Sequence, residues 1–527
     1  MTGPFELFSS THAASAKAIP LLLMPVVLLT LFGGPYSISG DEALTTLISG
    51  SDYGTAVETV SRDNHPPGYY SYLWVWIRLF GNSLTSLRLS STLCVAIMIL
   101  AAMKHLPGKA ALFIAISPFT AHLALEVRMY GMLAMWGLLL MIVLDSWNEK
   151  PGRWKALVSA IIVSAATWTH HFGWLALPVM LTVMLRRWAW RDALFASSMV
   201  FILYIPWMGK AFHQFSSFGG VAIEGANDLL PSIPISMRLA GAPLSVTGCI
   251  LRFSAGTTLT GFGLFSIESV SLWLIPGLIC MGLMTMSLLS NLRSRPVALT
   301  ILLWVLLPLS LLRPSSRHFS LAFPAFVCLV SAGTDRIGKK WKPFPVIVLL
   351  LLPLMWIPLA SRQTIPQRTS YHRDFREAAA VALDEADARG VPVVIDLDLY
   401  STLALLYHID QHGASSAVAW HPHMSLLEGE SFFYDDMSDA LAYLTTNTDS
   451  TVSLWKSEYG DMILIANDPG QVQGPASDAE NGFIGFDSGD ISDADLQTIL
   501  SAEATMTELK LSHSRGPFSV WAVDFIE

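Results

Sequence analysis

The residues best suited to acid–base chemistry in this chain begin with a pair of carboxylates. Asp41 and Glu42 directly follow an apolar run and the turn-forming Gly40. A partly desolvated carboxylate at a membrane surface is suited to take a proton from an acceptor hydroxyl. We therefore predict Asp41 and Glu42 as catalytic residues. The same Gly-Asp-Glu sequence also begins helices well, so a helix cap is the alternative on these residues alone.

A further carboxylate, Glu126, opens the sequence Glu126-Val-Arg128-Met-Tyr130, which leads into another apolar run. Glu126 and Arg128 are two residues apart, so their side chains do not face each other on a helix. Ionisable groups at membrane depth are costly and usually serve a function. We predict Glu126 as a catalytic carboxylate and Arg128 and Tyr130 as substrate-binding residues. The alternative is that Arg128 extends to lipid headgroups.

Three histidines lie in two turns of the first two hundred residues. His65 precedes two prolines that fix the backbone as the chain enters the aromatic run Tyr69–Phe80, and His170 and His171 occupy a tight turn. We predict that His65, Tyr69, His170 and His171 contact substrate, with His65 near a phosphate or sugar hydroxyl. Plain turns are the alternative at both places. Adjacent histidines have poor joint geometry for a metal ion, so we predict no metal site.

Arginine and histidine side chains also gather at the start of a late apolar run. Arg313, Arg317 and His318 stand together there. A helix N-terminus attracts anions, and a guanidinium binds phosphate oxygens with paired hydrogen bonds. At the membrane surface the natural anion is a lipid phosphate, so we predict that Arg317 and His318 contact a donor phosphate. Ordinary headgroup binding is the alternative.

The elements that must position these residues are membrane helices. The 527 residues are 52% hydrophobic and 14% charged, whereas a soluble domain carries about 25% charged residues. Residues 1–361 have a net charge of +10, but residues 362–527 hold 8 basic and 27 acidic residues, a net of −19. Such an acidic tail disfavours nucleic acid as a partner. The asymmetry indicates two domains in different surroundings.

Hydropathy predicts about eleven membrane-spanning helices in residues 1–361. They start near Ile19, Leu87, Ala110, Met129, Ala156, His171, Ala193, Ser271, Val297, Phe319 and Pro345. Short loops rich in Lys and Arg alternate with loops poor in them, which predicts a cytoplasmic N-terminus. Loops 33–86 and 209–268 and the C-terminal domain then lie outside, with the residues named above. We expect a multi-pass protein of the cell (inner) membrane with a periplasmic C-terminal domain.

Residues 362–527 have the pattern of a small soluble α/β domain. A helical pattern covers 373–389, and a strand follows at 391–396. Later short strands at 462–466 and 518–525 are separated by loops rich in Gly, Asp and Ser. Neither a Gly-rich phosphate loop nor an internal repeat is present, so the sequence does not indicate a nucleotide-binding domain.

Several of these motifs, in this order, resemble the family of polyprenyl-phosphate sugar transferases. The resemblance covers roughly residues 19–360 and rests on Asp41-Glu42, His65-Pro-Pro-x-Tyr-Tyr, Glu126-x-Arg128-Met-Tyr130, Thr169-His-His-Phe172 and Arg317-His-Phe-x-Leu-x-Phe-Pro324. The family includes protein O-mannosyltransferases, the aminoarabinose transferase of lipid A and the rhizobial lipid A galacturonosyltransferases.

The resemblance implies an inverting membrane glycosyltransferase of the GT-C type that uses a polyprenyl-monophosphate sugar. It implies that Asp41 is the base and that Arg128 and Arg317 contact the donor phosphate. The family often has Lys where this chain has His65, which leaves a permanent positive charge there in doubt. We expect membrane lipids and a glycan, lipid or protein acceptor as partners, and neither metal nor cofactor.

Three other functions are compatible with parts of the sequence. A transporter or flippase for lipid-linked sugars would bind the same lipid, but such proteins place charged coupling sites deep in their helices, which this sequence lacks. A membrane scaffold would not need Asp41, His65, Arg128 and Arg317 to converge. A lipid-phosphate phosphatase would use water in place of an acceptor.

Overall fold

The computed structural model describes most of the helical part of the chain and the core of its C-terminal part. The described residues are 23, 38–63, 65–106, 108–224, 242–243, 246–251, 253–254, 274–292, 295–312, 316–355, 375–396, 399–411, 417–419, 461–467, 504–509 and 518–525. The predicted helix near Ile19 and Arg313, which the sequence places beside Arg317, lie outside them. The chain divides into two compact units, Met1–Gly34 with Asn64–Ile365, and Pro35–Asp63 with Pro366–Glu527.

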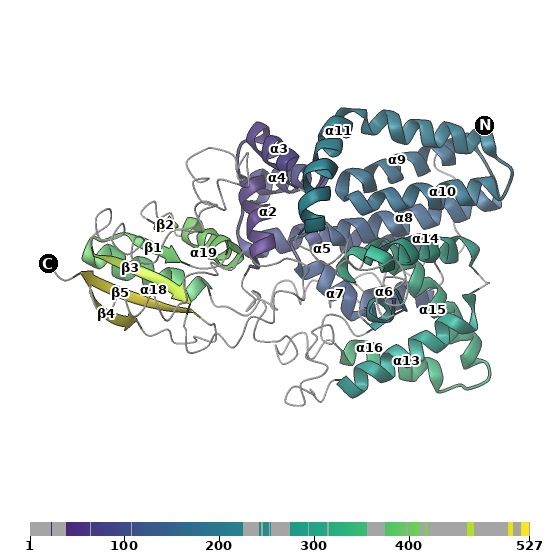
Figure 1. Cartoon of the computed structure of the whole chain (residues 1–527). Coiled ribbons are helices and arrows are strands. Elements are labelled where there is room, and N and C mark those ends of the chain that lie inside the picture. The colour runs from purple at the N-terminus through teal and green to yellow at the C-terminus, as the bar shows by residue number, and fades with distance from the viewer. Residues whose placement is uncertain are drawn as a thin grey trace. The chain divides into compact units, whose positions relative to one another are not determined.

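The first unit is helical throughout its described residues (Figure 1). Its elements are α4 (Gly68–Phe80), α5 (Leu84–His105), α6 (Gly108–Ile116), α7 (Pro118–Leu125), α8 (Tyr130–Glu149), α9 (Arg153–Thr169), η2 (His171–Leu175), α10 (Ala176–Leu185), α11 (Trp190–Glu224), α13 (Leu274–Ser290), α14 (Pro296–Leu312), η7 (Ser316–Ala322), α15 (Phe323–Gly338) and α16 (Phe344–Leu354). Helix α8 packs against α5, α9 and η7, and it forms the centre of this unit.

Four of the described helices are long and apolar enough to cross a membrane. They are Leu84–His105, Tyr130–Glu149, Trp190–Gln214 and Arg317–Gly338, and shorter apolar helices cover His171–Leu185, Ile275–Ser290, Pro296–Ser310 and Phe344–Leu354. A described helix lies at each predicted start from Leu87 onwards except Ser271, which is outside the described residues and precedes α13 at Leu274. Near Ala110, however, α6 has only 9 residues before Ser117 and Pro118 begin α7, which is too short to span alone. The count of eleven spans stays a prediction.

The exposed and buried faces of these helices fit a membrane protein. Helix α8 is buried almost all round, and a side chain at Gly137 would collide with the carbonyl of Leu321. By contrast, α11 exposes large apolar side chains, including Phe201, Ile202 and Ile205. A helix that leaves an apolar face uncovered in the folded chain is suited to contact lipid.

The second unit combines a sheet with helices from both ends of the chain. Its helices are α2 (Gly40–Gly50), α3 (Tyr53–Arg62), α18 (Phe375–Arg389) and α19 (Leu399–Gln411). Its described strands are β1 (Val393–Asp396), β2 (Ala417–Ala419), β3 (Met462–Asn467), β4 (Ala504–Leu509) and β5 (Phe518–Phe525). They form one sheet in the order β2-β1-β3-β5-β4.

The sheet is mixed. Strand β1 pairs in parallel with β2 and β3, while β5 pairs antiparallel with β3 and β4. Strands β1, β3 and β5 coincide with the three strands expected from the sequence, and β2 and β4 were not predicted. Helix α2 packs on α19, so the residues after the first predicted span belong with the C-terminal sheet rather than with the membrane helices.

Candidate functional site

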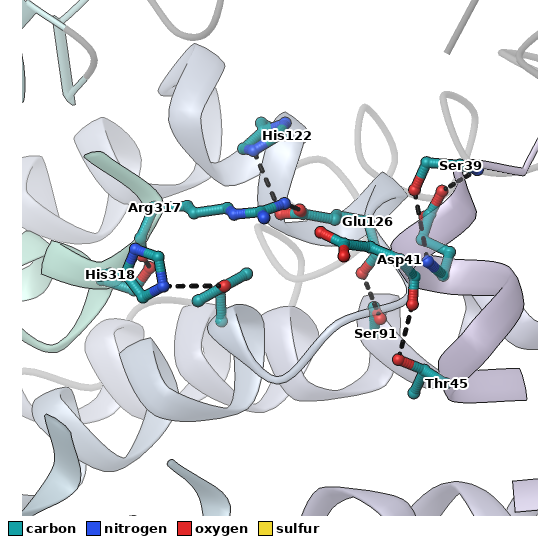
Figure 2. Close-up of polar contacts among 11 residues, drawn as sticks. Ser39, Asp41, Thr45, Ser91, His122, Glu126, Arg317 and His318 are labelled. Carbon is teal, nitrogen blue, oxygen red and sulfur yellow. Dashed lines mark hydrogen bonds and ion pairs between the residues drawn. The ribbon is translucent and has the colours of Figure 1, made fainter. Parts of the chain in front are cut away.

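A buried ion pair joins Glu126 and Arg317 in the first unit. The Nη1 atom of Arg317 lies 2.9 Å from Oε1 of Glu126, whose side chain is only 2% exposed, against 22% for Arg317. The second carboxylate oxygen, Oε2, lies 3.2 Å from Nε2 of His122 (Figure 2). One carboxylate therefore contacts two basic side chains, His122 and Arg317, which are 195 residues apart in the sequence.

The backbone around Glu126 is fixed by a sequence of hydrogen bonds. Ser117 caps α7 with Pro118 in its first turn, and the helix ends where the Glu126 N–H donates to the carbonyl of His122. The Ser91 hydroxyl donates to the Glu126 carbonyl at 2.7 Å, and Tyr69 Oη lies 3.5 Å from that hydroxyl. Tyr69, predicted to bind substrate, thus supports the backbone of Glu126 from α4.

On the other side of Arg317, aromatic rings continue the cluster. The guanidinium carbon lies 5.2 Å from the centre of the Tyr130 ring, in the range of a cation–π contact. The Tyr130 hydroxyl lies 3.3 Å from Nε2 of His318. Arg317, His318 and Tyr130, all predicted as binding residues, are therefore brought together by η7 and the start of α8.

Two further predicted histidines adjoin this cluster. The ring of His170 lies 5.4 Å from that of His65 and 5.5 Å from that of His318. The amide of Gln214 donates to the His65 carbonyl at 3.0 Å. Beside this turn, Gly68 lets α4 approach α9, since a Cβ there would lie 2.5 Å from the carbonyl oxygen of Trp168.

The hydrogen on the His170 ring can be placed from its contacts. This residue lies in the turn between α9 and η2, outside both helices, and its Nδ1 accepts the Phe172 N–H at 3.0 Å. Burial, together with the charges of His65, His318, His171 and Arg128, lowers the pKa of His170 well below its ordinary value. The ring is therefore neutral, and its hydrogen is on Nε2.

The remaining predicted binding residues of this unit lie close by. Arg128 is 4% exposed, and its charge acts on His170. His171 begins η2 and is half-buried. Arg128, which is always charged, contributes positive potential to the region around His170.

In the second unit, the predicted catalytic pair lies in the first turn of α2. Ser39, not Asp41, is the helix cap: its hydroxyl accepts the Glu42 N–H, and the Glu42 carboxylate accepts the Ser39 N–H at 2.8 Å. This reciprocal capping box engages the buried Glu42 in the start of the helix. Asp41 is half-buried, and its carbonyl accepts the Thr45 hydroxyl at 2.8 Å (Figure 2).

Comparison with solved structures shows the architecture of the whole chain. The chain matches the structure of ArnT from Cupriavidus metallidurans bound to undecaprenyl phosphate. The TM-score is 0.54, with 13% identity over 97% of this chain and 98% of that one. The apo state of the same protein gives a TM-score of 0.54 and 14% identity over the same shares. The chain has the GT-C fold.

The other comparisons with known proteins give weaker matches or none. The arabinofuranosyltransferase AftD from Mycobacteria matches with a TM-score of 0.47 and 12% identity over 98% of this chain and 42% of that one. No family model matches the sequence, and no curated protein sequence matches it either. The membrane character expected from the composition agrees with the GT-C fold and with the long apolar helices.

Within the GT-C fold, the cluster of the first unit is chemically suited to an anion. Arg128 and Arg317 are permanently charged, and histidines 65, 170 and 318 adjoin one another beside Tyr130, which packs on Arg317. Glu126 is the one acidic side chain in the contacts described above. Guanidinium and imidazole N–H groups are the donors that proteins use for phosphate oxygens. Among the described residues, no group of three His, Cys, Asp or Glu side chains could hold a metal ion.

Sequence reasoning missed three residues that hold this cluster together: His122, Ser91 and Gln214. His122 precedes Glu126 by four residues, the spacing that places two side chains on one helix face, so its contact could have been expected. Ser91 and Gln214 contact residues 35 and 149 positions away. No local pattern indicates such contacts.

Proposed function

We propose that this protein is a membrane glycosyltransferase that moves a sugar from a polyprenyl-monophosphate donor to an extracytoplasmic acceptor. The observation that carries the proposal is the cluster of Arg317, Arg128 and three histidines on a GT-C fold. The bound lipid of ArnT, undecaprenyl phosphate, is an anion of the kind this cluster suits. The resemblance of the sequence motifs to polyprenyl-phosphate sugar transferases supports the same donor.

The reaction is a displacement at the anomeric carbon of the sugar. An acceptor hydroxyl attacks this carbon, the bond to the phosphate oxygen breaks, and the lipid phosphate leaves as an anion. Asp41 takes the proton of the hydroxyl. Arg317 and Arg128 stabilise the charge that develops on the departing phosphate, and His65, His170 and His318 bind the same group. Attack from the face opposite the phosphate inverts the sugar.

The membrane setting assigned to this reaction follows the loop charges. The Lys- and Arg-rich loops support a cytoplasmic N-terminus, with the acidic C-terminal domain and the Asp41 segment on the periplasmic side of the inner membrane. The acceptor is a molecule of the cell envelope: lipid A or lipopolysaccharide, another glycan, or a protein. The mechanism above needs neither a metal ion nor a cofactor.

A transporter or flippase of lipid-linked sugars is the second candidate, since the anion cluster alone would serve it equally well. The two functions differ in their products. A transferase releases free polyprenyl phosphate and a glycosylated acceptor, whereas a flippase moves the donor lipid unchanged. Product analysis in reconstituted vesicles therefore separates them.

The decisive experiment has two steps. A mass spectrum of envelope lipids and glycans with and without the gene identifies the sugar that disappears. Transfer of that sugar from its polyprenyl phosphate is then measured with the purified Asp41→Asn protein, and we expect a loss of about 10²- to 10⁴-fold in kcat with donor binding retained.

Asp52→Asn is a matched control for this experiment. Asp52 is an exposed carboxylate of the same unit that caps α3 through the N–H groups of Gly54 and Thr55. Asn caps helices as well as Asp does, so this variant is expected to transfer sugar normally. Wild-type turnover by purified Asp41→Asn protein would remove the proposed role of Asp41.

A further inference from the structure

The Glu126 carboxylate is poorly placed for the catalytic role that the sequence suggested. Both of its oxygens are engaged, Oε1 by Arg317 at 2.9 Å and Oε2 by His122 at 3.2 Å, and the side chain is 2% exposed. A general base must come within about 2.6–3.2 Å of the proton that it removes. Neither oxygen is presented to a substrate in this arrangement.

Exposure increases in one direction along the three connected side chains. The Glu126 side chain is 2% exposed, that of His122 11%, and that of Arg317 22%. Arg317 is thus the member that a ligand reaches first. It also comes from a different element, η7, whereas His122 and Glu126 belong to α7 and its C-terminal cap.

The contacts of Arg317 restrict its guanidinium in two directions. Glu126 holds Nη1, and the Tyr130 ring lies 5.2 Å from the guanidinium carbon. A guanidinium presents five N–H donors in a rigid fork that matches the oxygens of a phosphate. Arginine has a long side chain with many rotamers, and a pre-formed orientation reduces the entropy lost when a phosphate binds.

His122 in turn fixes the carboxylate. Nε2 of His122 lies 3.2 Å from Oε2, an ion-pair contact when the ring is protonated. The His122 ring is itself held by packing, with its centre 6.0 Å from that of Phe119. The packed ring therefore orients Oε2, which leaves Oε1 directed to Arg317.

We infer that Glu126 and His122 are positioning residues that orient Arg317 toward an anionic lipid phosphate, and that Glu126 is not a proton acceptor. The inference rests on the proposed function for the identity of the ligand. It assigns a role to His122, and it changes the role of Glu126 from base to support of an arginine. The His122–Glu126 pair acts on binding, which needs no chemical step.

Equilibrium binding of undecaprenyl phosphate to the purified full-length chain tests this directly, because a lipid phosphate without a sugar requires no base. Glu126→Gln keeps the shape of the side chain but removes its charge. We expect it to weaken binding by about tenfold or more. A base would behave in the opposite way, with transfer lost and binding of the lipid phosphate unchanged.

His122 is tested by a pair of variants. His122→Leu removes the polar contact to Oε2 and should weaken binding by several-fold, whereas His122→Gln offers an amide N–H at similar reach and should recover most of it. In an Arg317→Ala background, which removes the guanidinium, Glu126→Gln should cost much less than in the wild type, since the two residues act through one contact. Full additivity would contradict the inference.

Asp335→Asn is the matched control. Asp335 also pairs with a cation, Lys109, but near the C-terminal end of α15 and with 42% of its side chain exposed, and its loss should leave binding unchanged. If the wild type itself binds no undecaprenyl phosphate, the proposed function fails. If the wild type and Glu126→Gln bind equally well, the positioning role fails and the proposed function stands.

Discussion

Two arginine–carboxylate pairs, one in each unit, have nearly the same geometry in different surroundings. Arg317 and Glu126 approach to 2.9 Å with side chains 22% and 2% exposed. Arg389 of α18 and Asp524 of β5 approach to 3.0 Å, but their side chains are 33% and 46% exposed. Arg389 also contacts Glu385, one helical turn before it.

The difference in burial decides what each pair contributes. An exposed pair is screened by water and salt and contributes about 0–1 kcal/mol to stability. A buried pair gains little over an apolar replacement, but removal of one partner costs about 3–5 kcal/mol, because the other charge stays buried. The Glu126–Arg317 pair is costly to break but contributes little net stability, so we interpret it as functional. Its Arg317 is a member of the anion-binding cluster.

The largest expected effect is that of Arg317→Ala. It removes the cation that pairs with the buried Glu126 carboxylate, so we expect local destabilisation near the lower end of about 3–5 kcal/mol, since Arg317 is itself partly exposed. Arg317→Lys keeps the charge but loses the forked geometry. Donor binding should therefore fall further in the Ala variant than in the Lys variant.

Hydrogen exchange of peptides from η7 and α8 measures the structural part of this prediction, and binding of a polyprenyl-phosphate sugar measures the functional part. Equal affinities of the Ala and Lys variants for the donor would count against a forked phosphate contact. Unchanged exchange in Arg317→Ala would show that the buried pair behaves like the exposed one.

The sequence predicted the members of this cluster better than their partners. His65, Arg128, Tyr130, His170, Arg317 and His318 stand out because polar residues at the ends of apolar runs are rare and costly. Their pairing could not be predicted, because Glu126 and Arg317 are 191 residues apart and nothing local specifies which carboxylate an arginine meets. The His122–Glu126 contact was accessible from its helical spacing and was overlooked.

Local sequence patterns also predicted where helices form more accurately than which helices pack together. The motif Ser39-Gly-Asp-Glu42 is a capping-box signature, and its helix forms with Ser39 as the cap. Hydropathy assigned this segment to the membrane part because it follows an apolar run. This helix packs on α19 of the C-terminal unit. The two helices are some 350 positions apart in the sequence, and hydrophobic periodicity does not indicate contacts at that separation.

An intermediate effect is expected from pH, since the buried cluster contains His170 and the exposed pair contains no group of this kind. The pKa of His170 is lowered in the folded chain, so the unfolded chain binds its proton first as the pH falls. Stability is then full above the ordinary value of about 6.5 and decreases below it, by up to about 1.4 kcal/mol per pH unit.

His170→Asn isolates this contribution. Its side-chain oxygen can accept the Phe172 N–H in place of Nδ1, and Asn does not titrate. The thermal unfolding midpoint of the wild type should fall more steeply between pH 7 and pH 5 than that of the variant. Parallel curves for the two proteins would mean that His170 takes up its proton in the folded state.

The smallest effect is expected from Arg389→Ala. Both partners of Arg389 are substantially exposed, so water replaces the lost contacts and neither Glu385 nor Asp524 is left buried and unpaired. We expect a change of about 0.5 kcal/mol or less, measured as hydrogen exchange of peptides from α18 and β5 in the full-length chain, with donor binding unchanged. High salt should reduce even this difference, because exposed pairs are screened, whereas the effect of Arg317→Ala should persist. If Arg389→Ala opened its unit as much as Arg317→Ala opens the other, burial would not be what separates the two pairs, and the functional interpretation of Glu126 and Arg317 would lose its physical basis.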